Sequence, residues 1–211
     1  PSHPLARRLI RALGEPIAAP SANVSGRPSA TDFQAARREL AGKADMILRG
    51  SPSRVGIEST VLDCTKRPFV ILRPGSVTLE ELRKYVPVRA RSARTGVKGS
   101  APSPGMKHGH YRPDCRVVPV ASGQWNKKLK GLMTRNRVLG VLSFRSAIPA
   151  SPRIVLARNF RGDARRMARE LYGSFLAAEK KGVDILAVEQ PDDSGIGTAV
   201  RDRIRRAARA E

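Results

Sequence analysis

The sequence has no long apolar run and few cysteines. No stretch approaches the roughly 20 apolar residues that a transmembrane helix requires, so no membrane association is expected. The two cysteines, Cys64 and Cys115, lie far apart and match neither a disulfide framework nor a zinc pattern, which is typical of cytoplasmic proteins. The three histidines, at 3, 108 and 110, lack neighbouring carboxylates. No metal site and no catalytic triad are therefore predicted.

Acidic and aromatic residues are also scarce. The 211 residues include 40 Lys and Arg but only 18 Asp and Glu, which gives a formal net charge of +22. Such an excess predicts attraction to polyanions such as RNA or nucleotides, although merely solvated arginines would give the same composition. Aromatic residues make up 4% of the chain, so Leu, Val, Ile and Ala must fill its core.

The first 87 residues show short helix and strand signals. An apolar stripe predicts a helix over residues 5–13 that ends at Gly14, and capping boxes at Thr31 and Thr78 predict two more helix starts. Strands are expected at residues 16–19, 44–48, 59–62 and 69–72. The last two are joined by a short polar connection, which predicts an antiparallel pair.

The remaining sequence divides into a linker and a second unit. Residues 88–115 are basic and show no apolar period, which predicts a linker that is either a spacer or functional. Beyond it, strands are predicted at 117–120, 138–144, 154–157 and 183–188, with helices at 126–135, 164–180 and 198–210. This alternation predicts a small parallel sheet covered by helices, with 138–144 as a central strand.

The last predicted helix is rich in arginine. Its arginines are interpreted either as a solvated face or as a patch that faces RNA: Arg201, Arg203, Arg205, Arg206 and Arg209.

Four motifs occur in order along the chain. They read Pro-Ser-Ala-Asn-Val-Ser-Gly at 20–26, Gly-Ile-Glu-Ser-Thr-Val at 56–61, Ile-Leu-Arg-Pro-Gly at 71–75, and Pro-Gly-Met-Lys-His-Gly-His-Tyr-Arg-Pro at 104–113. Together they resemble the two-domain threonylcarbamoyl-AMP synthases of the YrdC-like domain family. The resemblance implies an α/β fold: part of a YrdC-like twisted mixed sheet with helices over 1–87, an interdomain linker over 88–115, and a small parallel-sheet α/β domain over 116–211.

The resemblance also implies a reaction and its site. The family forms threonylcarbamoyl-AMP and pyrophosphate from L-threonine, bicarbonate and ATP, with Mg²⁺, as a nucleotidyltransferase step toward threonylcarbamoyladenosine in tRNA. By resemblance, Ser21 and Ser59 contact threonine. The residues implied to contact ATP are Asn23, Thr31, Arg73 and Tyr111. Hydroxyls and amides both donate and accept hydrogen bonds, and a guanidinium matches phosphate, so these residue types suit the substrates.

Other interpretations remain open from the sequence. Asn23 can cap its own loop, Ser59 can belong to a polar strand face, and Arg73 can be a turn residue. A non-enzymatic, basic RNA-binding module is the alternative function. Family domains also carry an upstream part with a Lys-x-Arg motif, so we expect this chain to be the C-terminal portion of a longer protein that does not complete the reaction alone.

Overall fold

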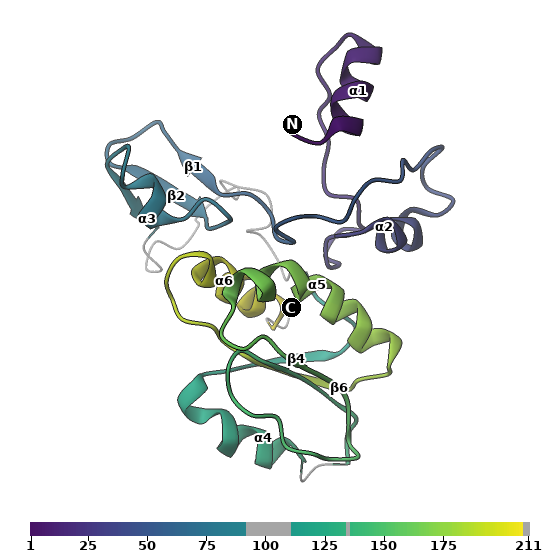
Figure 1. The fold of residues 1–211 in the computed structure, drawn as a ribbon, viewed down its shortest axis with the longest axis vertical. Coiled ribbons are helices and arrows are strands. Elements are labelled where there is room, and N and C mark those ends of the chain that lie inside the picture. The colour runs from purple at the N-terminus through teal and green to yellow at the C-terminus, as the bar shows by residue number, and fades with distance from the viewer. Residues whose placement is uncertain (92–110, 134–135, 209–211) are drawn as a thin grey trace.

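The computed structural model describes residues 1–91, 111–133 and 136–208, which form two parts (Figure 1). The first part carries three helices and a small sheet. The second part is a layered α/β unit with a larger sheet. In Figure 1 the helices α5 and α6 of the second part lie between its own sheet and the first part. The two parts therefore meet along these two helices.

The first part contains a three-stranded mixed sheet. Its elements are α1 (Pro4–Leu13), α2 (Phe33–Leu40), β1 (Val61–Asp63), β2 (Phe69–Arg73), α3 (Leu79–Leu82) and β3 (Val88–Ala90). The strand order is β1-β2-β3, with β1 antiparallel and β3 parallel to β2. The mixed sheet and the antiparallel pair predicted from the sequence are confirmed.

Helix ends follow local chemistry. Gly14 ends α1 with a positive φ of 77°, and the capping box between Thr78 and Glu81 opens α3 as predicted. At α2 the prediction is wrong by one residue. The carboxylate of Asp32 accepts a hydrogen bond from the Ala35 amide, so Asp32 and not Thr31 is the N-cap.

Two strand predictions in this part are wrong, and one strand lies where none is predicted. Residues 16–19 and 44–48 belong to none of the strands in the described ranges, since apolar character alone does not supply a pairing partner. Conversely, β3 lies within the predicted linker, because Val88 is buried and its strand pairs with β2. The boundaries at residues 87 and 115 stay predictions, and residues 92–110 lie outside the described part.

The second part is a four-stranded parallel sheet with helices on both faces. Its elements are β4 (Arg116–Val120), η1 (Ser122–Gln124), α4 (Trp125–Met133), β5 (Leu139–Ser143), β6 (Ile154–Asn159), α5 (Ala164–Lys180), β7 (Ile185–Glu189) and α6 (Ile196–Ala207). The order is β4-β7-β5-β6, and every pair is parallel. The predicted parallel sheet, with residues 138–144 as a central strand, is confirmed.

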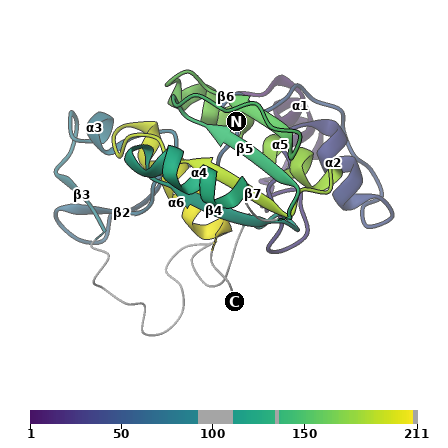
Figure 2. The ribbon, with the colours of Figure 1, turned by 90° about the horizontal axis from the view of Figure 1, so that it is seen from below.

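The core of the second part lies on the two faces of this sheet. On one face, Leu171 and Phe175 of α5 pack with Ile204 of α6 against β5 and β7. On the other face, Trp125 and Leu129 of α4 cover the sheet, which Figure 2 views from that side. All five residues are almost fully buried. No helix in the described ranges is long and apolar enough to cross a membrane.

Candidate functional site

A hollow of about 750 Å³ opens where the first part meets α5. Its lining includes the hydroxyl residues Ser21 and Thr31, the segment 51–58, and Tyr172 from α5. The lining thus combines two of the sequence motifs with a side chain of the second part. Several serine and threonine side chains belong to this lining, and small polar groups of this kind suit a small zwitterionic ligand.

The loop that carries Ser21 is shaped by its own asparagine. Asn23 Nδ2 donates to the carbonyl oxygens of Val24, at 2.8 Å, and Arg27, at 3.1 Å. Gly26 takes a positive φ of 84° and closes the turn. Asn23 Oδ1 is buried and accepts no hydrogen bond from the described residues. The Asn23 amide group therefore stabilises the loop through Nδ2, and its Oδ1 atom can still accept a hydrogen bond.

The segment 55–58 lies directly on α5. Gly56 has a positive φ of 82°, and a Cβ atom at this position would lie 2.4 Å from Arg169 Cα. Only glycine permits so close an approach of two backbones. On either side, Val55 and Ile57 pack against the core of the second part. The glycine of the Gly-x-Glu-Ser-Thr motif is thus required by contact with a helix.

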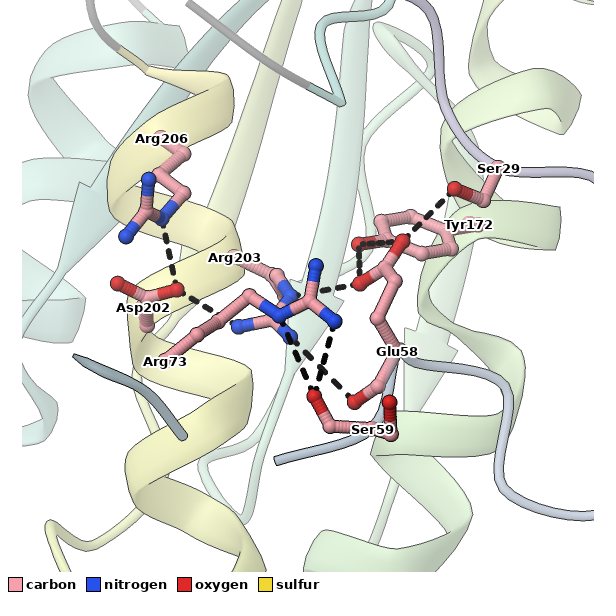
Figure 3. A network of polar contacts seen from close by, with 8 residues as sticks. All are labelled: Ser29, Glu58, Ser59, Arg73, Tyr172, Asp202, Arg203 and Arg206. Atoms are coloured by element: carbon pink, nitrogen blue, oxygen red, sulfur yellow. Dashed lines mark hydrogen bonds and ion pairs between the residues drawn. The ribbon is translucent and has the colours of Figure 1, made fainter. Parts of the chain in front are cut away.

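The carboxylate of Glu58 stands at the centre of a polar network that spans both parts (Figure 3). Ser29 Oγ donates to Oε1 at 2.7 Å. Tyr172 Oη donates to Oε2 at 3.0 Å, and Arg203 Nε donates to the same oxygen at 2.8 Å. Burial alone would raise the pKa of Glu58, but the charge and hydrogen bond of Arg203 outweigh it and lower the pKa. Glu58 is therefore ionised at neutral pH.

Arg203 is the buried cation of this network. Its side chain is 0% exposed, and it also pairs with Asp202 at 2.7 Å. Its guanidinium carbon lies 5.4 Å from the centre of the Tyr111 ring. Burial opposes the charge, but the neighbouring tyrosines and carboxylates raise the pKa of Arg203 overall. The prediction of a solvated or RNA-facing arginine is wrong at this position.

Arg73 and Ser59 lie next to this network. Arg73 donates to the Ser59 carbonyl oxygen from Nε, at 3.2 Å, and from Nη2, at 3.0 Å. These bonds hold the end of β2 against the residue that follows Glu58. Ser59 itself is exposed, so its hydroxyl remains accessible to a ligand.

Tyr111 is packed inside the network. The residue is 6% exposed, and its ring stacks on Tyr172 with 5.3 Å between ring centres. Its backbone has a positive φ of 67°, which is uncommon for a non-glycine residue. Burial raises the pKa of its hydroxyl. In this structure Tyr111 lies behind Tyr172, which is the residue that lines the hollow.

Two family models match successive stretches of the chain, and the second begins before α3 of the first part. The Sua5–YciO–YrdC model, described as telomere recombination, matches residues 1–75. The model for the C-terminal domain of threonylcarbamoyl-AMP synthase matches residues 77–209, which is well over half of the chain. The chain belongs to the threonylcarbamoyl-AMP synthase family.

Full-length relatives in this family extend beyond the region matched here. The threonylcarbamoyl-AMP synthase of Pyrococcus abyssi is 35% identical over 99% of this chain and 62% of its own length. That of Bacillus subtilis is 33% identical over 99% of this chain and 61% of its own length. The solved structure of P. abyssi Sua5 complexed with L-threonine matches with a TM-score of 0.86 and 33% identity, over 99% of this chain and 62% of that one. The chain thus spans about three fifths of the length of these relatives.

The residues assigned from the family resemblance differ in how close they lie to the hollow. The structure brings Ser21 and Thr31 together in the lining of the hollow, and it places Ser59 beside Glu58 at one end of the lining segment. Asn23 and Arg73 donate hydrogen bonds to backbone carbonyl oxygens next to the site. Tyr111 is not part of that lining, but it stacks on Tyr172, which is. Their contacts with threonine and ATP stay predictions.

Sequence reasoning missed three residues that build this site. Glu58 lies inside the Gly-x-Glu-Ser-Thr motif, but the motif does not indicate its role, and no sequence pattern marks Tyr172. Arg203 carried a detectable signal, since it occupies the same helical face as the buried Ile196 and Val200. An arginine on an apolar face needs a buried acidic partner.

Proposed function

We propose that this chain supplies threonine- and ATP-binding elements of an L-threonylcarbamoyladenylate synthase. The observation that carries the proposal is the hollow in which the Ser21 loop faces the Gly-x-Glu-Ser-Thr segment. A family relative has been solved with L-threonine bound, which supports the same ligand here. The reaction joins the amine of L-threonine to bicarbonate as a carbamate, with loss of water. A carbamate oxygen then attacks the α-phosphate of ATP and releases pyrophosphate.

The threonine end of this reaction needs small polar groups. An amino acid offers an ammonium, a carboxylate and a hydroxyl within a few ångströms. Hydroxyl side chains can donate to or accept from each of these groups. We assign this role to Ser21, which lines the hollow, and to Ser59, whose exposed hydroxyl follows the lining segment.

The nucleotide end needs positioning and positive charge. Carbamates are poor nucleophiles, so catalysis depends on alignment and on stabilising charge at the α-phosphate. We assign ATP contacts to Asn23, Thr31 and Arg73, with Tyr111 on the second-part side. Mg²⁺ enters this scheme bound to the phosphates of the substrate, as is common at nucleotide sites.

The cellular setting follows from the product. Threonylcarbamoyl-AMP is consumed in tRNA modification, and the charge of +22 suits a protein that works near RNA. We place the activity in the cytoplasm, where ATP and tRNA are available and where Cys64 and Cys115, both free in this structure, stay reduced.

Binding of L-threonine to the complete 211-residue chain tests the proposal. Titration calorimetry with L-threonine, in the presence of MgATP, should show saturable binding. Ser21→Ala should weaken it, since one preorganised hydrogen bond to a charged group is worth about 1.5–3 kcal/mol. The matched control is Ser194→Ala, which changes an exposed serine outside the hollow.

The same samples distinguish a synthase from an RNA-binding module. Threonine binding that depends on Ser21 supports the synthase assignment. The assignment fails if no threonine binds with or without MgATP while salt-sensitive RNA binding persists. Equal affinities of the wild type and Ser21→Ala for L-threonine would show that Ser21 does not contribute to threonine binding.

A further inference from the structure

The Gly-x-Glu-Ser-Thr segment is fixed at Gly56 and Glu58 by the second part, and at Ser59 by Arg73 of β2. Gly56 lies against the backbone of α5 at Arg169. Glu58 accepts hydrogen bonds from Tyr172 of α5 and Arg203 of α6. The next residue, Ser59, is held through its carbonyl oxygen by Arg73. The backbone that forms one wall of the hollow therefore takes its position from helices of the other part.

Both carboxylate oxygens of Glu58 are engaged. Oε1 accepts from Ser29 at 2.7 Å and lies 3.2 Å from the Tyr172 hydroxyl, whereas Oε2 accepts from Tyr172 and Arg203. Arg203 Nη2 also lies 3.5 Å from the Glu58 backbone oxygen. A carboxylate held in this way is suited to fixing a backbone and poorly suited to accepting a proton from a substrate.

We propose that Glu58, held by Tyr172 and Arg203, is a positioning residue that makes the threonine-binding wall depend on the second part. That threonine is the ligand rests on the proposed function, whereas the positioning of residues 55–59 by Glu58 does not. A buried arginine is costly to leave unpaired, so Arg203 strongly favours the arrangement in which Glu58 meets it. The wall is therefore formed when α5 and α6 are docked on it.

The loop that carries Ser21 has its own connection to the same helix. Arg27, in the loop that carries Ser21, pairs with Glu179 of α5 at 2.9 Å and with Asp114 at 2.6 Å. Ser29, farther along this loop, donates to Glu58. The Ser21 loop and the segment around Glu58 are thus both attached to α5, and the hydrogen bond from Ser29 to Glu58 joins them.

The test uses three variants of the complete chain and one control. Arg203→Met removes the guanidinium, Arg203→Lys keeps a cation, and Tyr172→Phe removes only the hydroxyl that donates to Glu58. The control, Arg158→Met, breaks the 2.9 Å pair with Glu170, which lies wholly within the second part. Each variant is measured by hydrogen exchange of backbone amides and by calorimetric titration with L-threonine in the presence of MgATP.

We expect exchange to rise locally in Arg203→Met and in Tyr172→Phe. In Arg203→Met, and less in Tyr172→Phe, amides of residues 53–60 should exchange at least tenfold faster while β5 and β7 keep their protection. The dissociation constant for L-threonine should rise at least tenfold in Arg203→Met. Arg203→Lys should recover a substantial part of both effects, and Arg158→Met should match the wild type.

Several results would overturn the proposal. Unchanged exchange at residues 53–60 in both Arg203→Met and Tyr172→Phe would show that the network does not position the wall. Faster exchange spread evenly over β5 and β7 would show that Arg203 serves only the fold, and if Arg203→Met does not fold, Tyr172→Phe decides. If the wild type binds no threonine, the proposed function fails, whereas the exchange data still decide the positioning role.

Discussion

The two parts of this chain are stabilised in different ways. Apart from Pro28, the buried apolar side chains in residues 1–91 are Ala35, Val70, Ile71 and Val88, and most of those in the described residues belong to the second part. Helix α1 buries none of its side chains, and Leu13 is 55% exposed. The second part instead fills both faces of a parallel sheet with side chains that are almost fully buried.

This difference bears on where the site lies. Capped helix ends, polar contacts and docking onto α5 and α6 order the first part, which has little core of its own. Regions with few buried apolar contacts open more readily, and ligand-binding segments are commonly drawn from them. The hollow is lined by residues of the weakly packed part together with Tyr172 of the tightly packed one. Its shape should therefore be sensitive to changes at the junction.

The largest predicted effect contrasts a core side chain with an exposed one. Phe175→Ala in α5 should lower the free energy of unfolding by about 3–5 kcal/mol, because it leaves a cavity in the core. Leu9→Ala in α1, where the side chain is 47% exposed, should change it by less than about 0.5 kcal/mol. Urea denaturation measures both. Equal losses would show that α1 belongs to the same cooperative unit.

A glycine pair tests the junction itself. Gly42→Ala places a side chain at a φ of 71° with open space around it, which should cost about 1–2 kcal/mol. Gly56→Ala has similar backbone strain and also collides with Arg169, which should add about 1–3 kcal/mol. Thermal unfolding compares the two variants. The account of the docked segment is contradicted if Gly56→Ala is the milder change.

A buried carboxylate gives the second part a distinct response to acid. Glu189, at the end of β7, is 0% exposed and accepts from the amides of Phe144, Arg145 and Ser146. Burial alone would raise its pKa, but the hydrogen bonds of Ser146 and Arg145 prevail and lower the pKa below the usual 4.5.

The direction of the pH effect follows from this lowered pKa. The contribution of Glu189 is present above pH 4.5 and should be lost as the pH falls through its folded-state pKa. Glu189→Gln should cost about 1–3 kcal/mol at pH 7, since buried amides lose their carboxylate acceptor. It should also flatten the decline of stability below pH 4.5. Denaturant titrations from pH 7 to pH 3 check both, and an unchanged decline would contradict the assignment.

The smallest predicted effect concerns the ion pairs of Arg27. Its side chain is 27% exposed, so the pairs with Glu179 and Asp114 are partly screened by solvent. Arg27→Met should lower stability by about 0.5–1 kcal/mol at low salt and by less at 1 M salt. Urea denaturation at the two salt concentrations measures the difference. A loss that does not depend on salt would indicate that packing of the Arg27 stem matters more than its charge.

The second part could be predicted from its sequence almost element by element. Continuous apolar runs such as 138–144 and the apolar face of residues 164–180 have few other solutions than buried strands and an amphipathic helix. The first part was harder, because residues 16–19 and 44–48 look like strands but lack partners. Strand pairing depends on contacts that no local pattern encodes.

The site could be located from its motifs but not built from them. The resemblance identified the Ser21 loop and the segment that contains Glu58, and the structure places both around one hollow. It gave no indication that Tyr172 and Arg203 hold Glu58. Tyr172 and Arg203 lie 114 and 145 positions after Glu58 in the sequence, and they meet it only because the two parts dock.

The most direct test of the account is hydrogen exchange of the complete chain with and without saturating L-threonine, in the presence of MgATP. The account predicts slower exchange in the segments that face the hollow, at residues 20–31 and 51–60, with no change in β5 and β7. Absence of protection in both segments, or protection confined to the second part, would contradict it.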